Sequence, residues 1–232
     1  MTIPSPFDPT AAAGGLQPVA AILFDLDGTL IDTDDEAVEA LSRRLQPILR
    51  RRAPSAARWI LMEAESPGNA LVTLLDWLNL DVSLMGLTDW LRRRRGVYPA
   101  DEFRLIAGVE EAVVALGGRY PVAIVTTRSR YHIDRFLEQF PPLAEVVRAS
   151  CGLQDTRRLK PHPAPVLEAA RRVGAPAQRC VMVGDTPVDI RAARRAGAWG
   201  VGVLSGFGRR HELVRAGANL ILNSSAELTS FL

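Results

Sequence analysis

The sequence predicts an α/β protein with a Rossmann-like core, in which a parallel sheet is flanked by helices and carries an all-helical insertion. Three observations lead to this fold class. Apolar runs alternate with amphipathic segments over residues 109–222, as expected when helices connect parallel strands. The run at 19–25 is apolar without alternation, which is typical of a strand buried on both faces. Residues 33–107 contain no convincing strand pattern.

The first strand ends in a pair of acidic residues. A flexible leader is expected at 1–17, which contain three prolines and two glycines without hydrophobic periodicity. The strand at 19–25 follows and runs into the sequence Asp-Leu-Asp-Gly-Thr. Because ligands of open α/β sheets bind beyond the carboxyl ends of strands, Asp25 and Asp27 would lie at the mouth of a ligand crevice. A turn that closes the strand is the alternative when these residues are taken alone.

A helical insertion is expected next. The segment 34–49 fits an amphipathic helix, and helical patterns continue from 55 to 98 with proline and glycine interruptions. We therefore assign 33–106 to a helical domain inserted between the first two strands of a core. That core would be formed by 18–32 and 107–232.

The remaining core elements alternate regularly. The expected helices lie at 109–117, 130–139, 163–173, 187–196 and 209–216. The expected strands lie at 122–125, 145–149, 180–183, 200–204 and 219–222, and the strand at 145–149 has the weakest pattern. Together with the first strand they would form one parallel sheet.

Composition narrows the classes of function. The chain has 232 residues, of which 47% are hydrophobic and 23% charged, as in an ordinary globular protein. A formal net charge of +2 is too small to indicate a polyanionic partner, so no nucleic acid is expected. No apolar run reaches the ~18 residues of a membrane span, and no signal peptide is visible. A cytoplasmic protein without a membrane partner is therefore predicted.

Three individual residues are informative. Cys151 and Cys180 fall in or beside expected strands, where small buried hydrophobes are a better interpretation than a disulfide or a metal pair. Lys160 is the only lysine among the 28 lysine and arginine residues. A lone lysine in an arginine-rich chain favours a site where a compact ammonium is needed and a planar guanidinium is not.

Polar side chains suited to one task follow three of the expected strands. They are Asp25 and Asp27, Thr126 and Thr127, and Asp185 with Asp189. Four carboxylates at one crevice repel each other unless a cation lies among them, and oxygen ligands without His or Cys favour Mg²⁺. With Lys160 and the hydroxyl groups, such a metal would make a phosphate cradle. A carboxylate nucleophile there can form an acyl phosphate.

In combination these residues resemble a known family. The motifs, in chain order, are Asp25-Leu-Asp-Gly-Thr-Leu30, Thr126, Lys160-Pro, and Gly184-Asp-Thr-Pro-Val-Asp189. They resemble the haloacid dehalogenase superfamily and, more narrowly, its phosphoglycolate phosphatase-like branch. The resemblance covers residues 19–232.

The resemblance implies a role for each motif residue. Asp25 would attack phosphorus and carry the aspartyl-phosphate. Asp27 would protonate the leaving group and then activate water. Thr126 and Lys160 would hold the phosphoryl oxygens. Thr127 would contribute a contact from its backbone amide, where relatives often have Asn or Ser.

The same resemblance implies a metal site and a cap. Asp25, Asp185 and the backbone carbonyl of Asp27 would hold Mg²⁺, and Asp189 would orient these ligands. The insertion at 33–106 is similar to the helical cap of the family, which closes over the crevice and selects the substrate. It contains no lysine, unlike the caps that provide one to form a Schiff base.

The predicted function is Mg²⁺-dependent hydrolysis of a small soluble phosphomonoester, with phosphoglycolate as the leading substrate. Hydrolysis of inorganic pyrophosphate is the alternative within the same family. A regulatory protein that keeps the fold without turnover is the alternative from another class. The expected partner is a small phosphorylated metabolite, and the chain is expected to be a monomer or a homodimer.

Overall fold

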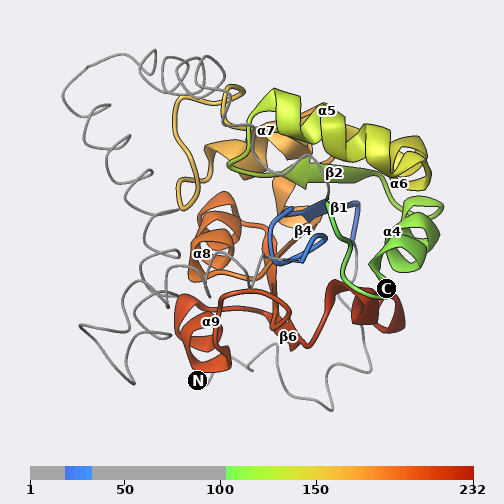
Figure 1. Ribbon diagram of the computed structural model, residues 1–232. Coiled ribbons are helices and arrows are strands. Elements are labelled where there is room, and N and C mark those ends of the chain that lie inside the picture. Colours follow the sequence, from blue (N-terminus) through green and yellow to red (C-terminus); the bar gives the residue numbers. More distant parts are fainter. Residues whose placement is uncertain (1–18, 33–102) are drawn as a thin grey trace, which may run out of the picture. The chain divides into compact units, whose positions relative to one another are not determined.

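The computed structural model describes residues 19–32 and 103–232. The predicted leader and almost all of the predicted helical domain lie outside these residues. Within them, six parallel strands form one sheet with helices on both faces (Figure 1), which confirms the predicted Rossmann-like α/β core. None of the helices in this described part is long and apolar enough to cross a bilayer.

The elements follow the alternation that the sequence predicts. The strands are β1 (Ala21–Phe24), β2 (Val122–Val125), β3 (Val147–Cys151), β4 (Cys180–Gly184), β5 (Trp199–Val203) and β6 (Leu220–Leu222). The α-helices are α4 (Val109–Gly117), α5 (Arg130–Gln139), α6 (Pro141–Val146), α7 (Ala164–Arg172), α8 (Pro187–Ala196) and α9 (Arg210–Ala216). Two 3₁₀ helices, η3 (Ala177–Arg179) and η4 (Ser225–Ser230), complete the described chain.

Most bounds agree with the prediction to within one or two residues, and the largest difference is near β3. The expected strand at 145–149 is shifted to Val147–Cys151 because the short helix α6 precedes it. Two prolines, Pro141 and Pro142, lie in the first turn of α6, where a missing backbone N–H costs nothing. This short helix is not among the elements predicted from the sequence.

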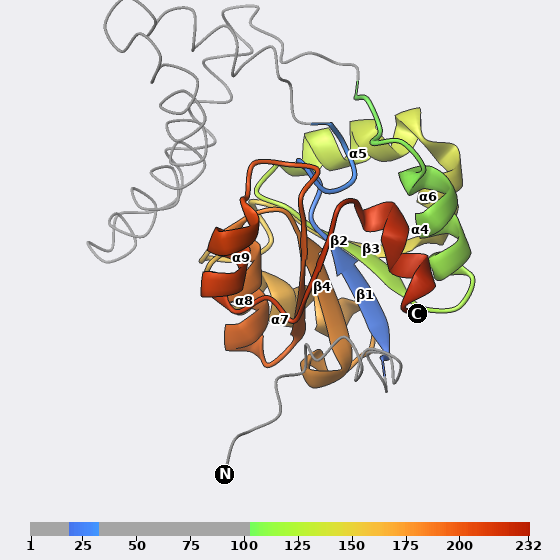
Figure 2. The same ribbon diagram turned by 90° about the horizontal axis from the view of Figure 1, so that it is seen from below.

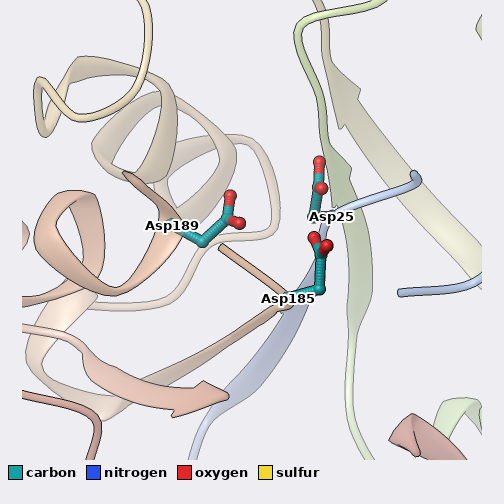
Figure 3. Close-up of side chains that lie close together, drawn as sticks. All are labelled: Asp25, Asp185 and Asp189. Atoms are coloured by element: carbon teal, nitrogen blue, oxygen red, sulfur yellow. The ribbon is translucent and has the colours of Figure 1, made fainter. Parts of the chain in front are cut away.

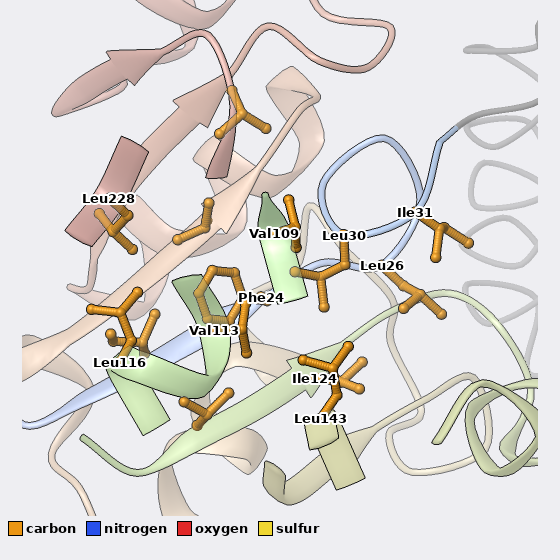
Figure 4. Packing of buried hydrophobic residues seen from close by; sticks show 14 of the residues in the cluster. Phe24, Leu26, Leu30, Ile31, Val109, Val113, Leu116, Ile124, Leu143 and Leu228 are labelled. Carbon is orange, nitrogen blue, oxygen red and sulfur yellow. The ribbon is translucent and has the colours of Figure 1, made fainter. Parts of the chain in front are cut away.

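The sheet is buried on both faces. In β1, Ile22 and Phe24 pack into one cluster with side chains of α4, α6 and η4. Figure 4 shows Phe24 within this cluster. Ala21 and Leu23 point to the opposite face and pack against α7 and α8. Figure 2 shows the two helical layers on either side of the sheet. Because both sets of alternate residues are buried, the strand lacks the polar positions of a half-exposed strand.

The strand order determines where the strand ends meet. The order is β3-β2-β1-β4-β5-β6, so β2 and β3 lie on one side of β1 and the later strands lie on the other. The switch point of the topology is therefore between β1 and β4. Phe24, the last residue of β1, is in register with Ile124 of β2 and Val183 of β4. Residues that follow these three strands therefore emerge at one edge, beside the switch point where open α/β sheets bind ligands.

Two short segments connect the core to residues 33–102. The backbone N–H of Asp32 donates to the Arg104 carbonyl (2.8 Å), and that of Ile106 donates to the Leu30 carbonyl (3.0 Å). The two segments therefore lie antiparallel to each other. Phe103 is 8% exposed and belongs to the main core cluster.

Candidate active site

Asp25 lies at the end of the central strand. Its backbone N–H donates to the Val183 carbonyl at 2.9 Å, which continues the pairing of β1 with β4 by one residue. The side chain is almost completely buried. Burial raises the pKa of the Asp25 carboxyl well above its ordinary value, and the ammonium of Lys160 opposes that shift. The nearby carboxylates of Asp189 and Asp27 raise it further.

Lys160 is the cation closest to this carboxylate among the described residues. Its Nζ donates to Asp25 Oδ1 (2.7 Å), Asp189 Oδ1 (2.6 Å) and the Val125 carbonyl (3.0 Å), and only 4% of the residue is exposed. Burial by itself would lower the pKa of Lys160, but the carboxylates of Asp189 and Asp25 outweigh burial and raise it. The side chain therefore stays a full positive charge.

Asp189 is held by the first turn of α8. Its Oδ2 accepts hydrogen bonds from the Thr186 backbone N–H (3.1 Å) and the Thr186 hydroxyl (2.5 Å). This capping box begins the helix and also satisfies one carboxylate oxygen. The other oxygen, Oδ1, accepts from Lys160. Helix capping thus orients Asp189 toward the site.

Asp185 directly follows β4 and is enclosed by backbone. Its Oδ2 accepts a hydrogen bond from the Phe207 N–H at 2.7 Å. Gly28, Gly206 and Gly208 pack so closely around it that a Cβ at any of them would overlap with Asp185 atoms. Gly28 also has a φ of +67°, a conformation that L side chains rarely adopt. These glycines form a tight seat for the carboxylate.

The structure brings three of the predicted acids together. Asp25, Asp185 and Asp189 each offer one carboxylate oxygen, and these oxygens lie within 4.8 Å of one another. Figure 3 shows Asp25 beside Asp185, with Asp189 reaching toward them from α8. All three are buried, and Lys160 is in contact with Asp25 and Asp189. The cluster keeps an excess of negative charge and offers only oxygen donors, which fits a hard divalent cation.

Asp27 stands apart from this cluster. Arg128 Nε donates to Asp27 Oδ1 (3.0 Å) and Oδ2 (2.8 Å), and Arg128 Nη2 donates to Oδ1 (2.6 Å). Arg128 belongs to none of the motifs that indicated the site from the sequence. The available signal was its place two residues after Thr126, where the second strand ends at the sheet edge.

The threonines that follow β2 lie at the same edge. The Thr126 backbone N–H donates to the Cys151 carbonyl (2.9 Å), and its Oγ1 accepts from the Arg128 backbone N–H (3.1 Å). Thr126 is 3% exposed, and Thr127 is partly buried. Since Oγ1 accepts from the backbone, the Thr126 hydroxyl hydrogen is oriented away from that amide and can donate to a ligand oxygen.

The chain is similar in sequence to proteins of one known family. A model of the haloacid dehalogenase-like hydrolase family matches residues 19–197. A phosphoglycolate phosphatase from Xanthomonas campestris is 32% identical over 192 residues, which cover 81% of this chain and 84% of the relative. A protein from Caldanaerobacter subterraneus, provisionally named a pyrophosphatase, is 28% identical over 80% of this chain and 81% of its own length.

Solved structures show the same fold. The crystal structure of a hydrolase from Pseudomonas syringae aligns with a TM-score of 0.65 at 26% identity and covers 91% of this chain and 96% of its own. A haloacid dehalogenase-like family hydrolase from Streptococcus pneumoniae aligns with a TM-score of 0.65 at 19% identity, over 92% and 98%. The second likeness concerns the fold alone.

Proposed function

Because this chain belongs to the haloacid dehalogenase-like hydrolase family, we propose that it is a Mg²⁺-dependent phosphatase for a small phosphomonoester and works through an aspartyl-phosphate on Asp25. One observation carries the proposal. A buried ammonium, Lys160, joins the Asp25 carboxylate to Asp189 beside a third buried acid, Asp185. That arrangement supplies a nucleophile, a positive charge for phosphoryl oxygens and ligands for a divalent cation.

The donor set fits a magnesium ion. Asp25, Asp185 and the backbone carbonyl of Asp27 would hold the ion, with Asp189 orienting the ligands and Lys160. The three clustered carboxylates carry more negative charge than the ammonium that contacts two of them can neutralise. A further cation would therefore stabilise the site. When bound, Mg²⁺ polarises the phosphoryl group as a Lewis acid and offsets its repulsion by the carboxylates.

The first half-reaction would use both aspartates of the first motif. An Asp25 carboxylate oxygen attacks phosphorus and forms an O–P bond, while the bond from phosphorus to the ester oxygen breaks. Asp27 transfers a proton to that departing oxygen, which leaves as an alcohol. Lys160 and Thr126 donate to the equatorial oxygens, on which negative charge accumulates in the transition state. The Thr127 backbone amide is a further donor in this proposal.

The second half-reaction reverses these roles. Asp27, now a carboxylate, accepts a proton from water, and the water oxygen attacks phosphorus. The bond between phosphorus and the Asp25 oxygen breaks, which releases inorganic phosphate and restores the nucleophile. One residue serves as acid and then as base because the same proton position is used in both steps.

Phosphoglycolate is the substrate we favour, because the relative with 32% identity is named phosphoglycolate phosphatase. Pyrophosphate is the second candidate, favoured by the 28% identical relative provisionally named a pyrophosphatase. Both are small phosphate compounds that a site of this kind can accept. A cytoplasmic location, a helical cap over 33–106 and a monomeric or homodimeric state stay predictions from the sequence.

A substrate panel tests the proposal. Purified protein with Mg²⁺ is assayed for phosphate release from 2-phosphoglycolate, pyrophosphate and 4-nitrophenyl phosphate. We expect turnover that a chelator abolishes and that Asp25→Asn lowers by at least about 10³-fold, since the nucleophile is lost. Faster release from pyrophosphate would favour the second candidate. Full activity of Asp25→Asn would contradict the covalent mechanism. The absence of turnover on all three compounds would favour a non-catalytic protein.

A further inference from the structure

Each catalytic aspartate of the proposed mechanism contacts a different cation. Lys160 contacts Asp25 and Asp189, whereas the guanidinium of Arg128 contacts Asp27. The Arg128 contact is bidentate, because Nε and Nη2 both donate to the carboxylate at 2.6–3.0 Å. A bidentate pair fixes the plane of the carboxylate as well as its distance from the guanidinium, whereas a contact with a single ammonium fixes only the distance.

The Arg128 side chain is itself fixed by its neighbours. Its backbone N–H donates to Thr126 Oγ1, which ties the residue to the end of β2. The ring of Phe103 lies against the guanidinium, with its centroid 5.4 Å from Cζ. Phe103 is in turn held by Gln139 of α5, whose amide accepts from the Phe103 N–H (2.8 Å) and donates to the Phe103 carbonyl (2.6 Å).

We propose that Arg128 is the positioning residue for Asp27, and that Phe103 supports it through its aromatic face. This inference rests on the proposed function, in which Asp27 must reach first the leaving oxygen and later a water molecule. A carboxylate on a loop can rotate away from both targets. The bidentate contact with Arg128 removes that freedom.

The alternative is that the pair simply braces the loop after β1 against the end of β2. Asp27 and Arg128 are partly exposed, with side-chain exposures of 18% and 31%, so such a brace adds little to stability. A brace and a positioning contact make different predictions. Loss of a brace would shift the loop, so it would lower the midpoint of thermal unfolding and change KM as well as kcat. Loss of a positioning contact lowers kcat while KM and the midpoint stay nearly unchanged, and it does so only while Asp27 is present.

A double-mutant cycle separates the two interpretations. Asp27→Asn, Arg128→Gln and the double variant are assayed with Mg²⁺ on 2-phosphoglycolate and 4-nitrophenyl phosphate, and thermal unfolding is recorded for each. For Arg128→Gln we expect kcat to fall about 100-fold with KM nearly unchanged, because a small misplacement of a catalytic group has an effect of this size. The double variant should be no slower than Asp27→Asn alone.

Further variants sharpen the cycle. Arg128→Lys keeps the charge but loses the bidentate contact, so its kcat should lie between those of the wild type and Arg128→Gln. Phe103→Leu keeps an apolar side chain but removes the ring, and kcat should fall by about 2–5-fold. Arg135→Gln removes an exposed ion pair with Glu138 within α5. It serves as the matched control, and its activity should be unchanged.

The outcomes also separate this inference from the proposed function. Losses in the double variant that multiply, or an Arg128→Gln enzyme as fast as Arg135→Gln, would overturn the positioning role while phosphatase activity stands. If the wild-type protein releases no phosphate from either compound, the proposed function fails first. If Arg128→Gln unfolds, the comparison of Arg128→Lys with the wild type in both Asp27 backgrounds decides the question.

Discussion

At the scale of single residues, the environment of Lys160 explains why a lysine is found there. Its three hydrogen bonds go to two carboxylates and one backbone carbonyl, all within 3.0 Å of one nitrogen. An ammonium group can direct three donors from a single atom, whereas a guanidinium spreads its donors over a plane. The use of the only lysine of the chain at this point is therefore a consequence of geometry.

The seat of Asp185 leads to a prediction about metal binding. Gly206→Ala would place a methyl group against the Asp185 carboxylate and displace it from the Phe207 N–H. We expect the affinity for Mg²⁺ to fall by about 10–100-fold, as for the loss of other groups that orient a metal ligand. Isothermal titration of the protein with Mg²⁺ measures this directly, without any substrate.

Gly118→Ala is the matched control for that measurement. Gly118 has ordinary helical dihedral angles, and the nearest atom to an added Cβ would be 3.5 Å away. Its affinity for Mg²⁺ should equal that of the wild type. Equal affinity in Gly206→Ala as well would show that the glycine seat does not orient the metal ligand.

At the scale of elements, α8 links helix formation to the site. Thr186 closes the first turn of α8 through Asp189, and the same carboxylate contacts Lys160. The Asp189 side chain thus accepts a hydrogen bond from a backbone N–H at the start of the helix, which would otherwise have no partner in the helix, and also orients the buried cation. Stability and site geometry are coupled at this helix end.

The substitution Thr186→Ala tests that coupling. Loss of the cap should lower the free energy of unfolding by about 1 kcal/mol, because a helix N-cap contributes roughly that amount. Urea unfolding followed by circular dichroism in the presence of a chelator provides the measurement. Thr229→Ala, which removes one exposed hydrogen bond in η4, should leave the midpoint nearly unchanged. Equal midpoints for both variants would argue against the cap.

At the scale of the whole molecule, the two helical layers bury the sheet and both cysteines with it. Cys151 and Cys180 are free and buried, which confirms the prediction that they are small core residues. Burial raises the pKa of Cys151 to about 12, with the carboxylate of Asp155 adding to the effect, and burial raises that of Cys180 to about 11. Neither thiol resembles the reactive type, whose pKa is lowered.

This burial predicts a pH dependence of thiol labelling. A thiol with a raised pKa forms thiolate only at higher pH, so at pH 8 the folded protein should react with a thiol reagent far more slowly than free cysteine. Denaturant exposes both side chains and restores their ordinary pKa, and two groups per chain should then react quickly. Rapid labelling of either cysteine in the folded protein at pH 8 would contradict the described core.

Much of the core and of the candidate site could be predicted from the sequence. Unbroken apolar runs such as β1 and β4 indicate strands buried on both faces, and the predicted bounds of α5 and α8 agree with the structure to the residue. Such features are encoded locally. The acids Asp25, Asp185 and Asp189 could be grouped because parallel strands deliver their carboxyl ends to one edge.

The remaining features depend on contacts between distant segments. Asp27 and Arg128 are separated by 101 residues, and no local pattern distinguishes this arginine from the many others in the chain. The backbone seat of Asp185 forms because the loop after β5 folds back over the end of β4. By itself the sequence determined the sheet, its strand ends and the chemistry that they carry. Only the tertiary structure decided which cation contacts which aspartate, since that depends on loops brought together by the sheet edge.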